Sequence, residues 1–312
     1  MPQHERLNNT ENPGTPLTIL ITGASGLIGT ALAARATADG HHVRRLVRRV
    51  PSAANEFRWD PSTGLIDSSA LIDVDVVVNL AGAPLNRLPW TPAYKKKIRQ
   101  SRLDATNTVV EAMRGMQTPP AVLLNASAVG YYGHRPGEKL VTSPARGTGF
   151  LADVCVAWEA AAQRAPEGVR VVTLRTGIVL SRTGGVLPLL ERIAKVGLAG
   201  PLGSGTQHWP WISLRDHVGA QMHLMTADVS GPINIVGPEQ VTAAKLITTV
   251  AHAVHRPYWL PAPRFALIAL LGDAARELLL SDQNVYPRRL LDAGYEFHDA
   301  RMEQLVTDLY AR

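Results

Sequence analysis

The chain is poor in cysteine and has no long apolar run. Its 312 residues include a single cysteine, Cys155, so no disulfide can form within the chain, and we expect a reducing, cytoplasmic environment. The apolar stretch at residues 265–271 is far too short to cross a bilayer, and we predict no membrane partner. Residues 1–16 are polar, with three asparagines and three prolines, and are predicted to form a disordered leader.

Charge and histidine spacing narrow the classes of ligand. The net charge of +6 suits an anionic small ligand such as a phosphorylated cofactor. Basic residues are spread along the chain rather than gathered in one tail, so nucleic acid is not a predicted partner. The ten histidines show no metal-ligand spacing, and we predict no catalytic metal.

A glycine-rich segment near the N-terminus carries the strongest functional signal. Residues 17–21 form an apolar run typical of a buried strand, three glycines follow at intervals of three, and residues 31–38 resemble a helix. A strand, a tight turn and a helix start in this order cradle a dinucleotide pyrophosphate, because glycine admits the phosphates and the helix N-terminus offers free N–H groups. The predicted cofactor contacts in this segment are Gly23, Ala24, Ser25, Gly26, Leu27, Ile28 and Gly29.

Apolar strands alternate with helices through the first half of the chain. The predicted strands are residues 43–47, 74–80, 121–126 and 169–174, and the predicted long helices are residues 94–113 and 150–164. Strands without strong alternation, separated by helices, indicate an α/β fold with a parallel sheet covered on both faces. Ligands of such sheets bind where the strand order reverses.

The second half is richer in glycine and proline, and we predict a change of domain near residue 180. Residues 17–180 are assigned to the cofactor-binding domain, to which a strand and a helix near residues 212–254 return. Residues 181–230 and 255–312 are assigned to a smaller substrate lobe over the C-terminal edge of the sheet. Residues 242–254 and 264–280 are predicted to be helical.

The end of the second strand predicts which cofactor is bound. An Asp or Glu there would hold the ribose 2′-hydroxyl of NAD, but residues 44–49 contain four arginines and no acid. A planar guanidinium suits a 2′-phosphate, so we predict NADP with Arg48 as the main contact. The alternative is that these arginines only form a solvated face. Small residues around Gly82, at the end of the next apolar strand, would let the backbone pass close to the adenosine.

Taken together, these motifs resemble the extended short-chain dehydrogenase/reductases. The segments that carry the likeness are residues 22–29 and 79–82. A branch described as NAD-dependent epimerase/dehydratase-like, or epimerase-family, proteins is similar at residues 101–102, 126–133, 158–162, 174–180, 203–207, 211–216, 277–283 and 287–291. The resemblance implies a Rossmann-type, doubly wound parallel sheet with a small C-terminal substrate lobe.

The resemblance also implies NADP contacts outside the glycine segment. Leu80 and Ala81 would contact the cofactor at a strand end, and Lys97 and Arg102 would do so from the first long helix. Ile178 would lie near the nicotinamide.

One motif of most active superfamily members is missing. They carry Tyr-x3-Lys on the helix after the Ser-bearing strand, where the Lys lowers the pKa of the Tyr and the Tyr exchanges a proton with the substrate. None of the seven tyrosines here has a lysine four residues later. The predicted replacements are Ser127, which would orient the substrate oxygen, and Tyr131 or Tyr132 as the proton donor. Loop packing is the alternative role for each tyrosine.

Other polar residues near these motifs have less specific roles. Cys155 and Glu159 lie four apart on one helix face, and a carboxylate raises the pKa of a neighbouring thiol, so Cys155 is predicted to be a small buried apolar residue. Glu159 is expected to hold a ribose hydroxyl or a polar network. Arg215 and Asp216 are expected to pair with each other.

Two functions follow from these observations. The first is an NADP-dependent oxidoreductase or epimerase-like enzyme of the extended short-chain dehydrogenase/reductase type, acting on a small carbonyl or hydroxyl compound. The alternative is a non-catalytic NADP(H)-binding regulator or sensor, which the missing Tyr-x3-Lys favours. The sequence leaves the substrate, the direction of hydride transfer and the oligomeric state open.

Overall fold

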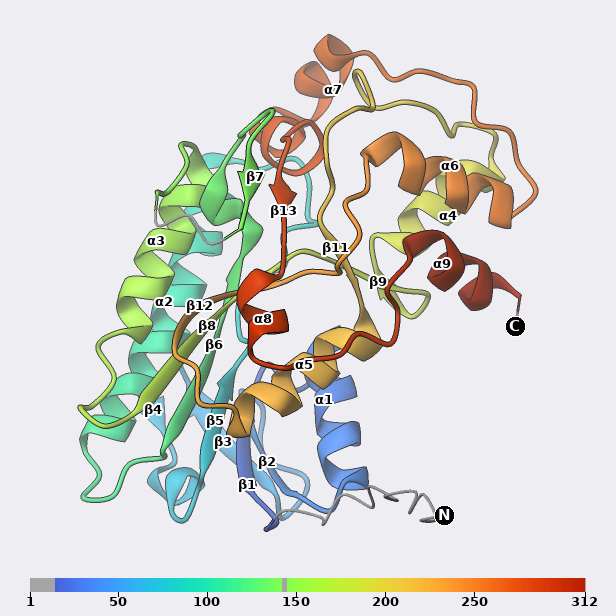
Figure 1. Cartoon of the computed structure of the whole chain (residues 1–312). Coiled ribbons are helices and arrows are strands. Elements are labelled where there is room, and N and C mark those ends of the chain that lie inside the picture. Colours follow the sequence, from blue (N-terminus) through green and yellow to red (C-terminus); the bar gives the residue numbers. More distant parts are fainter. Residues whose placement is uncertain (1–14, 142–144, 312) are drawn as a thin grey trace, which may run out of the picture.

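An eight-stranded sheet forms the centre of the computed structural model, which describes residues 15–141 and 145–311 (Figure 1). The strand order is β12-β8-β6-β5-β1-β2-β3-β4, and all neighbours pair in parallel except β3 and β4. The strands are β1 (Thr18–Thr22), β2 (His42–Val47), β3 (Glu56–Asp60), β4 (Leu65–Ile66), β5 (Val76–Asn79), β6 (Val122–Ala128), β8 (Arg170–Thr176) and β12 (Gly231–Ile235). The predicted α/β fold with a Rossmann-type parallel sheet is therefore confirmed.

The strand order reverses at β1, which lies between β2 and β5. From β1 the chain builds β2 and β3 on one side, then crosses back to build β5, β6, β8 and β12 on the other. The register places Thr22 beside Asn79, and Asn79 beside Asn125. The carboxyl ends of β1, β5 and β6 thus meet at one edge of the sheet, where the predicted site lies.

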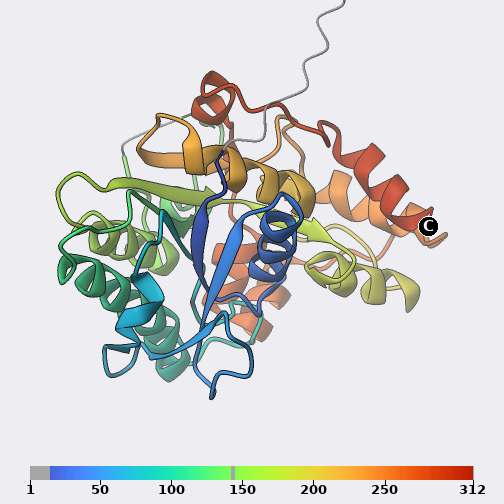
Figure 2. The ribbon, with the colours of Figure 1, turned by 90° about the horizontal axis from the view of Figure 1, so that it is seen from below.

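Helices cover both faces of the sheet. Figure 2 shows α2 (Pro92–Arg114) and α3 (Phe150–Ala162) on one side and α1 (Leu27–Ala38) on the other, where α5 (Leu214–Thr226) also packs. Neighbouring residues of β1 therefore point into different cores, Ile19 toward α1 and α5 and Leu20 toward α2. Burial on both faces explains why the strands read as nearly continuous apolar runs.

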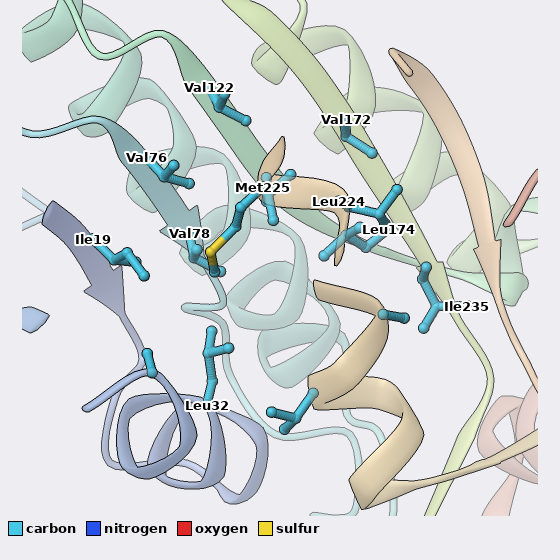
Figure 3. Close-up of a cluster of buried hydrophobic side chains, with 14 of the residues drawn as sticks. Ile19, Leu32, Val76, Val78, Val122, Val172, Leu174, Leu224, Met225 and Ile235 are labelled. Atoms are coloured by element: carbon cyan, nitrogen blue, oxygen red, sulfur yellow. The ribbon is translucent and has the colours of Figure 1, made fainter. Parts of the chain in front are cut away.

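The core between the sheet and helices α1 and α5 is built from branched side chains (Figure 3). Leu32 of α1 and Leu224 and Met225 of α5 pack against the sheet. The strand residues that meet them are Ile19, Val76, Val78, Val122, Val172, Leu174 and Ile235. This layer fixes the position of α1, whose N-terminus follows the glycine segment.

A smaller lobe packs beside the carboxyl edge of the sheet (Figure 1). It has its own apolar cluster, formed by helices α4 (Leu187–Lys195), α6 (Ala243–Ala253) and α9 (Met302–Tyr310) and by β9 (Ile178–Ser181) and β11 (Trp211–Ser213). Strand β9 lies between β11 and the short β10 (Gly184–Gly185) in a three-stranded sheet. The main-sheet elements α5 and β12 and the lobe helix α6 all fall near residues 212–254, and the predicted domain boundary stays a prediction.

The remaining C-terminal elements follow α6 in the chain. They are α7 (Arg264–Leu271), the π-helical turn η3 (Ala275–Leu279), β13 (Asn284–Val285), which pairs with β7 (Lys139–Leu140), and α8 (Arg288–Asp292), which packs against the start of β12. The prediction that residues 264–280 are helical is confirmed for α7 and η3, but these are two elements rather than one, because Gly272, with a φ of +59°, ends α7. Short 3₁₀ turns are η1 (Ser68–Leu71) and η2 (Val129–Tyr132).

The predicted leader, residues 1–16, falls outside the described residues except for its last two. Within residues 15–141 and 145–311, none of the helices combines the length and apolarity that crossing a bilayer requires.

Candidate functional site

The glycine segment forms a tight turn between β1 and α1. Gly23 has a φ of +66°, and a Cβ there would lie 2.9 Å from the carbonyl carbon of Leu80. A Cβ at Gly29 would lie 2.4 Å from the carbonyl oxygen of Gly23. Gly26 is the N-cap of α1 and provides no capping side chain, and both Ser25 and Gly26 are exposed. The turn is thus closed to side chains on its inner side and open to a ligand on its outer side.

A buried polar network fixes the strand ends beside this turn. Thr22 Oγ1 donates to Asn79 Oδ1 over 2.7 Å and accepts from the backbone N–H groups of Leu80 and Ala81. Asn79 Nδ2 in turn donates to Asn125 Oδ1 over 2.7 Å. Thr22, Asn79 and Asn125 are all fully buried, so the network sets the path of the backbone at Leu80 and Ala81.

The four arginines of residues 44–49 have different surroundings. Arg44 donates to backbone carbonyls, including that of Ile72, and the Nε of Arg45 is buried without a hydrogen-bond partner among the residues that the structure describes. Arg49 forms a two-bond pair with Glu56, with Nη2 to Oε1 at 2.5 Å. Arg48 is exposed just beyond β2 and makes no ion pair in the described part of the chain. Because Leu46 lies beside Thr22 in the sheet register, Arg48 follows a strand end next to the glycine segment.

Arg102 of α2 lies behind the end of β5. A Cβ at Gly82 would lie 3.2 Å from its Cγ, its Nη1 donates to the carbonyls of Ala83 and Ile98, and its guanidinium lies 5.0 Å from the centre of the Trp158 ring. Burial lowers the pKa of Arg102. None of the described carboxylates forms an ion pair with it, so it remains a half-buried cation beside the predicted adenosine path.

The other two predicted contacts lie on different elements. Lys97 is exposed on α2. Ile178 begins β9 beside Trp211, where it is half-buried against the cluster of the smaller lobe.

The hairpin that Ile178 begins approaches the N-terminus of α1. A Cβ at Gly184 of β10 would lie 3.2 Å from Leu27 Cδ1. The hairpin of β9 and β10 therefore borders the first turn of α1.

Ser127, at the end of β6, belongs to a buried ionic network. Its Oγ donates to Glu159 Oε1 over 2.6 Å. Arg175 donates to the same carboxylate twice, from Nε and from Nη2, each over 2.8 Å. The side chains of Arg175 and Glu159 are only 3% and 12% exposed. Glu159 thus holds a polar network, and the network fixes the Ser127 hydroxyl.

The two tyrosines of turn η2 have unequal positions. Tyr132 is fully buried, donates to Asn234 Oδ1 over 2.6 Å and accepts from Arg175 Nη1 over 3.2 Å, and burial raises its pKa. Tyr131 is half-buried, with its ring centre 3.4 Å from the guanidinium carbon of Arg175. This placement favours loop packing over proton donation for Tyr132, so we retain Tyr131 as the candidate donor.

Helix α3 presents apolar groups to the turn that follows β6. Leu151 and Cys155 are both buried and are four residues apart. A Cβ at Gly130 would lie 3.1 Å from Leu151 Cβ and 3.8 Å from Cys155 Sγ. Burial and the nearby Glu159 carboxylate raise the pKa of the Cys155 thiol to about 12, so this cysteine is an inert packing residue, as predicted. On this face of α3, Leu151 and Cys155 are apolar, and the next residue along it, Glu159, is already paired with Arg175.

The expected pairing of Arg215 with Asp216 is wrong. Asp216 is fully buried, and its carboxylate accepts from the Tyr295 hydroxyl and from the backbone N–H groups of His298 and Asp299. It joins α5 to the C-terminal segment, more than 70 residues away in sequence. No group of three or more His, Cys, Asp or Glu side chains able to hold a metal ion occurs in the described ranges.

Sequence reasoning also missed several residues that shape this region. Arg175 carried a signal, because a charge inside an otherwise apolar strand requires a buried partner. Asn234 carried none, and Glu277 appeared only within a segment that resembles the family, since the partners of both come from distant segments.

Two family models match the chain. The NAD dependent epimerase/dehydratase family matches residues 19–237, and a domain of unknown function, DUF1731, matches residues 262–309. An epimerase family protein of Mycobacterium bovis is 44% identical over 282 residues, which are 90% of this chain and 93% of that protein. The human epimerase family protein SDR39U1 is 34% identical over 301 residues, which are 94% of this chain and 99% of that protein.

A solved structure supports the same assignment. The crystal structure of human SDR39U1 (isoform 2) with NADPH superimposes with a TM-score of 0.85 at 30% identity, covering 95% of this chain and 99% of that chain. The strand order, the glycine turn and these matches agree along almost the whole chain. The protein therefore belongs to the NAD-dependent epimerase/dehydratase family of the extended short-chain dehydrogenase/reductases, and within it to the epimerase family proteins of the SDR39U1 type.

Proposed function

We propose that the protein binds NADP(H) at the carboxyl ends of β1, β2 and β5 and acts as an NADP-dependent oxidoreductase on a small carbonyl or hydroxyl compound. The observation that carries the proposal is the turn at Gly23, Gly26 and Gly29. Side chains are excluded from its inner side, and its outer side faces the uncapped N-terminus of α1. A pyrophosphate fits such a turn, because backbone N–H groups and the helix dipole bind it together.

The flanking cations fit the phosphorylated form of the cofactor. Arg48 is an exposed guanidinium without an ion pair among the described residues, and it follows a strand end beside the glycine segment. A 2′-phosphate would accept two parallel hydrogen bonds from it. The chain offers no acid at this strand end to hold a free ribose hydroxyl. Arg102, Lys97 and the backbone at Leu80 and Ala81 would complete the cofactor site.

The proposed chemistry rests on Ser127 and Tyr131. When bound, the nicotinamide supplies a hydride donor or acceptor. The Ser127 hydroxyl donates its proton to Glu159, so its Oγ can only accept a further hydrogen bond. A substrate hydroxyl that donates to this Oγ would be oriented by it. Tyr131 lies half-buried on the turn η2, which follows β6, and donates or accepts the proton at its phenolic oxygen. Leu151 and Cys155 exclude water from the α3 side.

A second candidate function follows from the same α3 face. Leu151 and Cys155 are apolar and cannot carry protons, and the thiol pKa of about 12 keeps Cys155 protonated. A protein that keeps the cofactor site but has no proton-transferring side chain at Leu151 and Cys155 suits the alternative function, an NADP(H) sensor. Sensor and enzyme differ in turnover. An enzyme oxidises NADPH in the presence of at least one compound from a panel of carbonyl substrates, whereas a sensor oxidises NADPH with none of them.

Titration with NADPH and with NADH, followed by nicotinamide fluorescence, tests the cofactor site. We expect NADPH to bind at least about tenfold more tightly, because hydrogen bonds to a charged group contribute about 1.5–3 kcal/mol. Arg48→Ala should abolish this preference. Arg49→Ala is the matched control, since it removes the same charge from a side chain already paired with Glu56. Equal binding of the two cofactors by the wild-type protein would refute the role of Arg48.

A further inference from the structure

A small cavity lies where the C-terminal segment meets the turn after β6. Its volume is about 190 Å³, and its walls come from three segments that are far apart in sequence. The turn after β6 contributes Gly130 and His134, the start of α3 contributes Leu151, and the C-terminal segment contributes Glu277, Ser281 and Gln283. Gly130 also packs against Leu151 and Cys155 of α3, and Cys155 Sγ donates to the carbonyl of Ala128, the residue that follows Ser127.

Two charged side chains line this wall, Glu277 and Arg276, and Glu277 is the carboxylate. The π-helical turn η3 carries it to the N-terminus of α3, where Oε1 accepts from Phe150 N over 2.7 Å and Oε2 from Leu151 N over 2.6 Å. Gly149 makes this approach possible, because a Cβ there would lie 3.1 Å from Oε1. Each oxygen uses one lone pair in these bonds, so one on each remains for a ligand. Burial raises the pKa of this half-buried carboxyl, while the two backbone bonds and Lys95 oppose that rise.

The other polar groups in the wall offer both acceptors and donors. Gln283 Nε2 donates to the carbonyls of Val129 and Gly133, which leaves its carbonyl oxygen as an acceptor. Ser281 Oγ donates to the carbonyl of Gly133 and can still accept. His134 accepts from Asp282 N at Nδ1, so the proton of its neutral ring lies on Nε2. A ligand of this cavity must therefore bring donors for these oxygens, and it meets N–H donors at His134 and Arg276.

Charge around the cavity distinguishes hydroxyl from ammonium donors. Arg276 lines the cavity and pairs with Asp273, and Lys95 pairs with the same aspartate over 2.6 Å. The N-terminus of α3 adds a partial positive charge at Glu277 itself. These cations already balance the Glu277 carboxylate and would repel an ammonium group, so neutral hydroxyls are the favoured donors.

Size further limits the ligand. Pockets for drug-sized molecules begin at about 300 Å³, and this cavity is smaller than that. A cavity of this volume suits a small compound, such as a single six-membered ring, better than a nucleotide.

We propose that this cavity is the substrate subsite and that Glu277 determines specificity there, accepting hydrogen bonds from two hydroxyls of a small neutral polyhydroxy compound. The proposal rests on the proposed function, since it names the substrate class of the same site. The C-terminal domain then supplies the recognition group, the end of β6 supplies Ser127, and the turn after β6 supplies Tyr131.

Ligand binding to NADPH-saturated protein tests this assignment. The probes are myo-inositol, xylitol and D-glucose as neutral polyols, cyclohexylamine as an ammonium compound and UDP-glucose as a nucleotide-linked one, each followed by saturation-transfer NMR. We expect at least one polyol to bind the wild-type protein, and its Kd to rise at least about tenfold in Glu277→Gln. The control is Glu239→Gln, because Glu239 also accepts a backbone N–H, that of Met302 at the start of α9, but does not line the cavity.

Several outcomes would overturn the proposal: no polyol binding by the wild-type protein, polyol binding unchanged in Glu277→Gln, or tighter binding of cyclohexylamine or UDP-glucose than of every polyol. Should Glu277→Gln fail to fold, Ser281→Ala removes a different acceptor from the same wall and should weaken polyol binding several-fold, and an unchanged Kd there would also overturn it. NADPH fluorescence in the same samples separates the two proposals. NADPH binding without polyol binding refutes the subsite alone, whereas absence of NADPH binding refutes the proposed function.

Discussion

Removing the Arg175 guanidinium is the most direct test of the ionic network that holds Ser127. In Arg175→Met the carboxylate of Glu159, only 12% exposed, loses both of its charged hydrogen bonds and keeps only that from Ser127. Breaking a buried pair in this way costs about 3–5 kcal/mol, because an uncompensated charge stays in the interior. For a chain of 312 residues this corresponds to a fall in Tm of roughly 5–8 °C.

Two further variants make the measurement specific. Arg170 lies on the same strand and donates only to backbone carbonyls, among them those of Leu224 and Met225, so Arg170→Met removes an arginine without leaving a buried carboxylate unpaired. We expect it to lose about half as much stability as Arg175→Met. The double variant Glu159→Leu/Arg175→Met should recover most of the loss, since no buried charge remains. Thermal unfolding followed by circular dichroism compares all four proteins. A loss below about 1 kcal/mol in Arg175→Met, or a double variant less stable than the single one, would refute this reasoning.

The remaining predictions concern His217 and Ser127. Burial lowers the pKa of His217 to about 4, whereas in the unfolded chain this histidine takes up its proton near pH 6.5. The free energy of unfolding should therefore fall by up to about 3 kcal/mol as the pH drops from about 6.5 to 4. Urea unfolding midpoints across this range should show a shallower pH dependence in His217→Gln, and an identical slope in both proteins would contradict the assignment. Ser127→Ala should abolish carbonyl-dependent NADPH oxidation in a spectrophotometric assay while leaving the NADPH titration unchanged. Equal turnover by this variant would exclude Ser127 from the reaction.

The centre of the sheet was predictable because its strands are buried on both faces. β1, β5 and β6 lie in the interior, so their sequences are continuous apolar runs that local pattern alone identifies. Strands β3 and β4, the last two at one end of the sheet, escaped this reasoning. β3 buries Trp59 well but leaves its other positions partly or fully exposed, and β4 is two residues long. A short, half-exposed strand has no sequence signal that separates it from a loop.

The glycine segment was predictable for a similar reason: its requirement is local. The φ of +66° at Gly23 and the close approach to Leu80 demand glycine at one position, and the spacing to Gly29 follows from the turn itself. The roles of Tyr131 and Tyr132 were not predictable in this way. The two residues are chemically identical neighbours, and only the path of η2 sends one ring into the core and leaves the other half-buried.

The C-terminal domain holds the turn after β6 and the start of α3 through hydrogen bonds of Gln283 and Glu277. Sequence reasoning could not find these bonds, because the residues that they join are more than 100 residues apart along the chain. Gln283 donates to the carbonyls of Val129 and Gly133, at the two ends of the turn that follows Ser127. Glu277 caps α3, whose own N-cap, Gly149, has no side chain to do so. A buried carbonyl or a helix N-terminus without a partner is costly, so the turn and the start of α3 depend on the C-terminal segment for their conformation. The segment that matches DUF1731 is therefore part of the wall of the candidate site, and a search for the substrate must use the whole chain.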